Sequence, residues 1–166
     1  MIRQNRKELR MKIRRAENKD TARIMELLRQ VNNVHSDVRP DLFLRDKTKY
    51  TEDELHEIMQ HEELPIFVAV DENDRVLGYM FGKLESHVKD NNFPDITTFY
   101  IDDLCVDEAS RGQHVGKALY EHTVQYAKSI GCYNLTLNVW EGNRGAQAFY
   151  DACGLKPLKI GLETVL

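Results

Sequence analysis

Residues 101–119 constrain the fold more than any other part of the chain. An apolar strand runs into a turn with two closely spaced glycines, Gly112 and Gly116, and the turn opens into an amphipathic helix. The first amides of such a helix have no intrahelical partners and lie at the positive end of the helix dipole. They can bind a phosphate or pyrophosphate, and Arg111 and Lys117 add positive charge beside them. This segment therefore predicts a phosphate-binding turn.

The spacing of the turn excludes two common nucleotide sites. A P-loop needs four residues between its glycines and a Ser or Thr after its lysine to hold magnesium. Here three residues separate Gly112 from Gly116, and Ala118 follows Lys117. A dinucleotide-binding G-x-G-x-x-G is also missing from the sequence. Neither a P-loop nucleotide hydrolase nor a dinucleotide-binding domain is therefore predicted.

Three segments instead resemble the motifs of one family in order. Arg111-Gly-Gln-His-Val-Gly116 resembles motif A, Arg/Gln-x-x-Gly-x-Gly/Ala, of the GNAT N-acetyltransferase superfamily. Residues 101–107 and 135–140 resemble its fourth and fifth strands. Residues 143–155 are similar to its N-x-x-A-x-x-F-Y-x-x-x-G-F signature. One departure is His114, which replaces the usual glycine. If that position needs a positive φ, histidine is among the residues that tolerate it.

The resemblance implies a binding site for acetyl-CoA as co-substrate. The pantetheine arm would pair with the backbone of the fourth strand, which would also polarise the thioester carbonyl, at Leu104, Cys105 and Val106. The pyrophosphate would be held by the backbone amides of the turn, namely Arg111, Gly112, Gln113, His114, Val115, Gly116 and Lys117. Asn143 would contact the arm from the start of the last helix.

Three further residues are candidates for proton transfer. Tyr150 matches the family's general acid, which would protonate the departing thiolate. The spacing alone favours a core aromatic, and the context of the three motifs favours the acid. Asp102 and Asp103 are the candidate bases, and strand alternation predicts that they point to opposite faces of the sheet. The alternatives are that both lie at a solvated strand end, or that water replaces a dedicated base. Cys105 is interpreted as a buried structural thiol rather than a nucleophile.

Composition limits the class of protein. The chain has 166 residues and a net charge of −4, which argues against general nucleic-acid or anionic-membrane binding. No apolar run approaches the roughly 20 residues of a membrane span, and no signal-peptide pattern is present. Its three cysteines lack metal-ligand spacing and predict reduced thiols in the cytoplasm, with no metal site.

The order of predicted elements indicates a mixed α/β fold. Residues 1–10 are expected to be a flexible basic extension, followed by a single GNAT domain at 11–166. Hydrophobic periodicity predicts a helix whose buried stripe contains Ile24, Leu27, Leu28 and Val31. A mostly irregular stretch at 34–45 and a terminal β pair at 155–166 are also predicted. The resemblance implies a mostly antiparallel sheet with splayed central strands, flanked by helices.

The predicted function is transfer of an acetyl group from acetyl-CoA to a primary amine of a small molecule, by direct attack on the thioester. Protein N-terminal or lysine acetylation is the alternative enzyme function. Ribosomal-protein N-terminal acetyltransferases place a glutamate in the fifth strand, where this chain has Asn138, which disfavours that variant. A non-catalytic acyl-CoA-binding regulatory module is a third hypothesis, and a homodimer is left open.

Overall fold

The computed structural model describes residues 10–87, 89 and 91–166, so the predicted extension lies outside the described residues except for Arg10. A single sheet has the order β1-β2-β3-β4-β5. Neighbouring strands are antiparallel except for the parallel pair β4–β5, which confirms the expected mostly antiparallel sheet. The strands are β1 (Lys12–Arg15), β2 (Ile66–Val70), β3 (Val76–Ser86), β4 (Thr97–Val106) and β5 (Asn134–Leu137).

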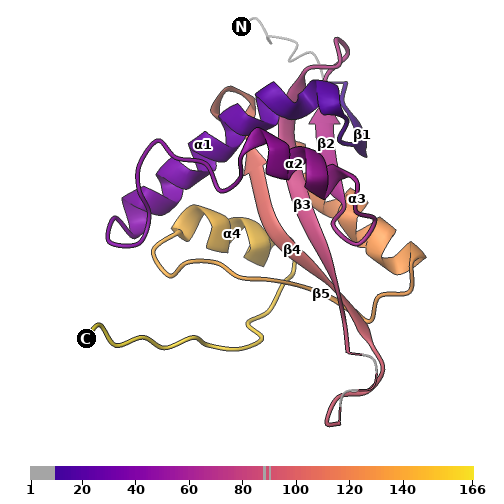
Figure 1. The fold of residues 1–166 in the computed structure, drawn as a ribbon, viewed down its shortest axis with the longest axis vertical. Helices are drawn as coiled ribbons and strands as arrows, with labels where there is room; N and C mark the ends of the chain where they lie inside the picture. The colour runs from indigo at the N-terminus through magenta and orange to yellow at the C-terminus, as the bar shows by residue number, and fades with distance from the viewer. Residues whose placement is uncertain (1–9, 88, 90) are drawn as a thin grey trace, which may run out of the picture.

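Helices cover both faces of this sheet (Figure 1). They are α1 (Thr21–Val38), α2 (Glu52–Met59), α3 (Val115–Ser129) and α4 (Arg144–Ala152), with short 3-10 turns η1 (Asn18–Asp20) and η2 (Glu108–Ser110). One core cluster lies between the sheet and α1 and α2, and a second lies between the sheet and α3. The fold is therefore a three-layer α/β arrangement.

Helix α1 bears out its predicted apolar stripe but is longer than predicted. Ile24, Leu27 and Leu28 are fully buried, as expected of positions i, i+3 and i+4 on one helix face. The helix continues to Val38, so the expected irregular stretch at 34–45 is wrong for its first five residues. Arg39 leaves the helical conformation, with φ −135° and ψ 72°, because the residue before a proline disfavours it.

A β-bulge interrupts the pairing of β3 with β4. Phe81 lies opposite Asp103 and Gly82 lies opposite Ile101, so Asp102 is an extra residue on β4. A bulge of this kind shifts the alternation of side chains beyond it. Phe99 and Ile101 accordingly belong to the core on the α3 side, whereas Cys105 belongs to the core on the α1 side. The bulge therefore reverses the faces of β4 halfway along the strand.

Strand β5 and the residues after α4 differ from the prediction. β5 ends at Leu137 rather than Trp140, and it pairs with β4 only from Thr98 to Ile101 in the described chain. The expected terminal β pair at 155–166 is wrong, because these residues form neither strand nor helix. They leave α4 and run apart from the strands to the C-terminus (Figure 1). The half of β4 beyond Ile101 thus has a neighbouring strand on the β3 side alone, which is the expected splay.

Candidate active site at the open edge of strand β4

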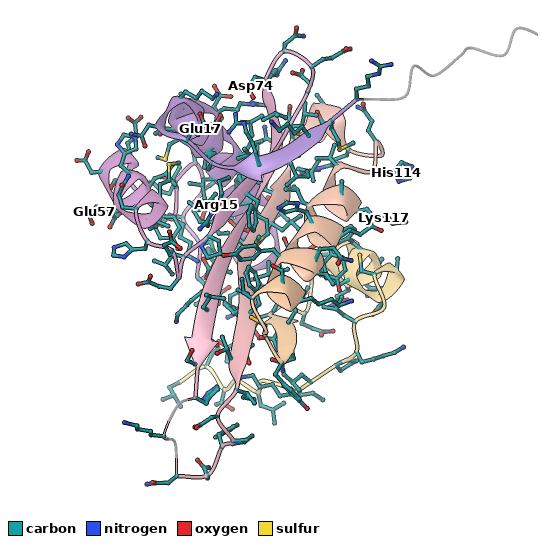
Figure 2. The ribbon with its side chains drawn as sticks, turned by 90° about the vertical axis from the view of Figure 1, so that its right-hand side faces the viewer. Arg15, Glu17, Glu57, Asp74, His114 and Lys117 are labelled. Atoms are coloured by element: carbon teal, nitrogen blue, oxygen red, sulfur yellow. The ribbon has the colours of Figure 1, made fainter. Side chains whose placement is uncertain are left out.

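The turn before α3 contains two residues in the left-handed backbone conformation. Gly112 has φ 73° and His114 has φ 63° with ψ 13°, so the position where His114 replaces glycine is indeed left-handed. The first hydrogen bond of α3 joins the Ala118 N–H to the His114 carbonyl at 2.9 Å. The amides that precede Ala118 in the helix thus lie at its positive end. His114 and Lys117 project outward from this end (Figure 2).

The two glycines of the turn have different surroundings. A Cβ on Gly112 would meet no atom within 4 Å, whereas one on Gly116 would lie 3.4 Å from Phe149 and Val106. Gly112 is therefore on the open side of the turn, and Gly116 allows α4 to pack against α3. The basic side chains remain exposed: Arg111 lies 3.9 Å from Glu108, and Lys117 lies 3.7 Å from Glu121.

The second half of β4 presents a backbone edge beside this turn. Leu104, Cys105 and Val106 pair with β3 on one side and lie beyond the last β4–β5 pair on the other. The Cys105 thiol donates to the Leu27 carbonyl at 3.5 Å, and burial raises its pKa to about 12. A thiol with so high a pKa is a poor nucleophile, in agreement with its interpretation as structural.

Asp102 and Asp103 lie on the same side of the sheet, so the expectation of opposite faces is wrong. Tyr50 donates to Asp102 at 3.1 Å, and Tyr79 donates to Asp103 at 2.8 Å. Both tyrosines pack on the ring of Phe81, with centroids 5.7 and 4.9 Å from it. The physical reason is the bulge, which adds one residue to β4 between two positions that otherwise alternate. The two carboxylates therefore form one cluster.

The two carboxylates have different environments. Asp102 also accepts from the Lys49 ammonium at 2.6 Å, and its side chain is 27% exposed. Asp103 is more deeply set, and desolvation raises its pKa to about 6, with the charge of Asp102 acting in the same direction. Carboxyls with a pKa near neutrality can exchange protons in the physiological range. Asp103 is therefore the better candidate for a base.

Tyr150, the candidate general acid, lies on α4. It lies partly buried on α4, edge to face with Phe149 at a centroid distance of 5.0 Å. Burial raises the pKa of its hydroxyl, and the negative charge of Asp103 raises it further. The charge of Asp103 on β4 thus acts on a hydroxyl that α4 carries. The hydroxyl consequently stays protonated at neutral pH and can act as a proton donor.

Asn143 has a structural role at the start of α4. Its side-chain oxygen accepts from the Ala146 N–H at 3.1 Å and caps the helix. This bond orients the helix that carries Tyr150, in addition to any contact with a ligand.

Sequence reasoning did not identify Lys49, Tyr50 or Tyr79 as part of this cluster. Tyr79 lies inside an apolar strand, where an aromatic residue has the pattern of the core. Lys49 and Tyr50 lie in an irregular loop, 53 and 52 residues before their partner Asp102. A contact between residues so far apart in the sequence leaves no local pattern from which it could be predicted.

Two other acidic residues, Asp41 and Asp95, have hydrogen-bond partners of their own. Asp41 is paired with Arg39, and Asp95 accepts from the Lys89 amide. Within the described residues, no group of three or more His, Cys, Asp or Glu is arranged to hold a metal ion. The helices of that same part of the chain include none long and apolar enough to cross a membrane.

Comparison with known proteins places these features in a family. The sequence model of the acetyltransferase (GNAT) family matches residues 24–155. The chain is 36% identical over 64 residues to glucosamine 6-phosphate N-acetyltransferase of Arabidopsis thaliana, covering 39% of this chain and 41% of that protein. It is 34% identical over 94 residues to peptidyl-lysine N-acetyltransferase YjaB of Salmonella typhimurium, covering 57% and 52% respectively. The alignments thus span about half or less of these relatives.

Solved structures match over nearly the whole chain. A mutant of the BH1408 protein from Bacillus halodurans superposes with a TM-score of 0.88 at 29% identity, covering 93% of this chain and 99% of that one. An aminoglycoside acetyltransferase from an uncultured soil metagenomic sample, in complex with sisomicin, superposes with a TM-score of 0.71. The two sequences are 19% identical, and the superposition covers 94% of this chain and 96% of that one. At this low identity the similarity shows a shared fold.

Proposed function

Because the chain belongs to the GNAT acetyltransferase family, we propose that it transfers an acetyl group from acetyl-CoA to a primary amine of a small molecule. The observation that carries the proposal is the backbone edge of β4 beyond Ile101, which has a neighbouring strand on the β3 side alone and lies next to the turn of α3. Asp103, with a pKa of about 6, is a candidate base, and the Tyr150 hydroxyl, whose pKa is raised by burial, is a candidate acid. Direct acyl transfer to an amine uses a proton acceptor and a proton donor of this kind.

The described residues suit acetyl-CoA, which would supply the acetyl group as a thioester. The amides at the start of α3 would bind the pyrophosphate, with the open side of the turn at Gly112. The backbone of Leu104, Cys105 and Val106 would pair with the amides of the pantetheine arm, in the manner of an added strand. The same backbone would stabilise negative charge on the carbonyl oxygen during transfer.

Asp103 would accept the proton that the acceptor amine must lose before it attacks. Above pH 6 this carboxyl is mainly ionised, since its pKa is about 6. Tyr150 would donate its proton to the departing sulfur. The charge of Asp103 raises the pKa of Tyr150, so uptake of a proton by Asp103 lowers that pKa again. Proton acceptance at one end of the site therefore favours proton donation at the other.

Two features favour a small cationic amine as acceptor. Asp102 already binds an alkylammonium group, that of Lys49, at 2.6 Å. Lys49 and Tyr50 both bind this carboxylate and partly cover it. An acceptor must therefore reach Asp102 between these two side chains, and a small molecule can do so more readily than the surface of a folded protein. Two relatives are named as acetyltransferases of glucosamine 6-phosphate and of peptidyl lysine. A lysine side chain in a flexible peptide is thus the second candidate, because Lys49 shows that such a side chain reaches Asp102.

The test is mass spectrometry of a panel of small amines and lysine peptides incubated with the protein and acetyl-CoA. We expect acetylated small amines, with turnover lost in Asp103→Asn. A peptide that is acetylated with a higher kcat/KM than every small amine would overturn the choice of acceptor. If acetyl-CoA binds but no acceptor is modified, the protein is instead an acyl-CoA-binding regulatory module.

A further inference from the structure

The Lys49 side chain is a primary amine that the chain itself places beside both carboxylates of the candidate site. Its ammonium binds Asp102 at 2.6 Å and lies over the ring of Tyr50, 5.3 Å from the ring centroid. Its positive charge also acts on Asp103, where it opposes the rise in the pKa of that carboxyl. Lys49 therefore lies where the proposed function places the amine of an acceptor.

The loop that carries Lys49 is held by contacts on both sides of this residue. The Thr48 hydroxyl donates to the Tyr50 carbonyl at 2.9 Å, and the Tyr50 ring stacks on Phe81 of β3 with a centroid distance of 5.7 Å. Thr51 then caps the start of α2. Because the backbone is fixed at this point, less conformational freedom is lost when the Lys49 side chain reaches into the site.

The Lys49 amine is also close to the proposed position of the thioester. Asp102 directly follows Ile101, the last residue of β4 that pairs with β5. Leu104, the first of the residues proposed to bind the thioester carbonyl, is two positions further along the strand, a distance of about 7 Å. The Lys49 side chain is 48% exposed, and a lysine carries its amine on a flexible four-carbon stem. Rotation of this stem can therefore carry the amine from Asp102 to the thioester.

We propose that Lys49 is a self-acetylation site, which the protein modifies with acetyl-CoA within the same chain. This inference rests on the proposed acetyl transfer and adds a second, built-in acceptor to it. Acetylation removes the positive charge of a lysine. The Asp102 carboxylate thereby loses the ammonium that binds it, and the chain carries an amide at the position of an acceptor amine.

The step balances as a simple acyl transfer. The Lys49 ammonium gives one proton to the Asp103 carboxylate, and the nitrogen lone pair then attacks the thioester carbonyl carbon. An N–C bond forms, the C–S bond breaks with its electron pair on sulfur, and Tyr150 protonates that sulfur. The second proton of the amine returns to the Tyr150 oxygen, and Asp103 releases the first to water. Lys49 ends as a neutral acetamide, with one thiol formed and one proton released.

The first experiment incubates the purified chain with acetyl-CoA and follows individual lysines by peptide mass spectrometry. Lys47 is exposed and lies two residues earlier in the same loop, so it reports the uncatalysed reaction. We expect Lys49 to be acetylated at least about 100-fold faster than Lys47, because a held amine reacts at a high effective concentration. The gain stays below the highest effective concentrations, because desolvation lowers the pKa of Lys49 but its contacts with Asp102 raise it further, and the amine stays charged.

Two substitutions assign the modified residue by the mass of the intact chain. Lys49→Arg keeps a positive charge opposite Asp102 and should abolish the rapid gain of one acetyl group per chain. Lys47→Arg is the matched control and should leave that gain in place. Circular dichroism and thermal melting confirm that both variants are folded.

The second experiment tests whether the candidate site catalyses the reaction, and within which chain. Asp103→Asn should slow acetylation of Lys49 by about 10²- to 10⁴-fold and leave that of Lys47 unchanged. The rate constant for wild type should not depend on protein concentration. When a Lys49→Arg chain is mixed with a differently tagged Asp103→Asn chain, the second should stay unmodified at Lys49. Its rapid modification would overturn transfer within one chain.

The remaining outcomes separate this inference from the proposed function. Equal rates at Lys49 and Lys47 would overturn the inference, as would a Lys49 rate that Asp103→Asn does not change. If small amines are acetylated while Lys49 is not, the inference fails and the proposed function stands. If acetyl-CoA binds and neither Lys49 nor any added amine is modified, both fail. Acetylation of Lys49 without that of any added small amine supports the inference and overturns the choice of a small-molecule acceptor.

Discussion

Replacing Asp103 by asparagine should stabilise the protein at pH 8 while removing its activity. The ionised carboxyl is held in a desolvated site, and its pKa is raised from 3.8 to about 6. Asparagine has nearly the same shape and can still accept the 2.8 Å hydrogen bond from Tyr79. The substitution therefore removes the cost of a buried charge without opening a cavity or leaving the tyrosine hydroxyl unpaired.

The sign and size of the effect follow from the pKa of Asp103. Between about pH 4 and pH 6 the folded protein still holds this proton, whereas the unfolded chain has released it. The folded state thus binds more protons, and the free energy of unfolding falls as pH rises through this window. At 1.36 kcal/mol per pH unit, the gap between 3.8 and about 6 corresponds to an upper value of about 3 kcal/mol. Asp103→Asn should recover most of it above pH 6 and none below pH 4.

Urea denaturation of wild type and variant at a series of pH values from 4 to 8 measures this difference. Asp102→Asn is the matched control, because it removes a carboxylate that is paired with Lys49 at the surface. We expect it to destabilise by less than about 1 kcal/mol. A difference between Asp103→Asn and wild type that does not change with pH would refute the argument. In parallel, kcat/KM should fall by about 10²- to 10⁴-fold in this variant.

Four further substitutions test the site. Tyr150→Phe should keep acetyl-CoA binding and lower kcat by about 10²- to 10⁴-fold, since the hydroxyl is needed only as charge develops on sulfur; unchanged turnover would remove it from the mechanism. Tyr79→Phe removes a hydrogen bond that lowers the pKa of Asp103, so the rise of kcat/KM with pH should move to higher pH. His114→Gly relieves a left-handed φ of 63° and should stabilise the fold by about 0.5–1 kcal/mol in urea denaturation. Gly116→Val should crowd Phe149 and abolish the stabilisation of about 2.7 kcal/mol expected at 100 times the acetyl-CoA dissociation constant, measured by thermal shift.

The sequence predicted those parts of the fold that depend on residues close to one another in the chain. The turn before α3 could be read from the spacing of Gly112 and Gly116, and the buried stripe of α1 from its helical period. The strand–turn–helix order then placed the motif on β4 and α3 correctly. Each of these features depends on residues within a few positions of one another.

Other features depended on contacts that the sequence does not display. Tyr79 looks like any core aromatic until β3 is paired with β4 and its hydroxyl meets Asp103. The influence of the Asp103 charge on the pKa of Tyr150 joins residues 47 positions apart in the sequence. Residues 155–166 have the pattern of a strand, but a strand also needs a neighbouring edge, and in this structure these residues pair with none.

The bulge at Asp102 links the main features of the candidate site. Without it, strict alternation would place Asp102 and Asp103 on opposite faces, and only one carboxylate could meet an acceptor amine. With it, both carboxylates lie on the face that carries Phe81, and the faces of β4 reverse just after its pairing with β5 ends at Ile101. The backbone beyond that point is open to a ligand strand next to the turn of α3. A single inserted residue thus places the proposed base, Asp103, and the carboxylate that binds the Lys49 ammonium, Asp102, on one face at the start of the open strand edge.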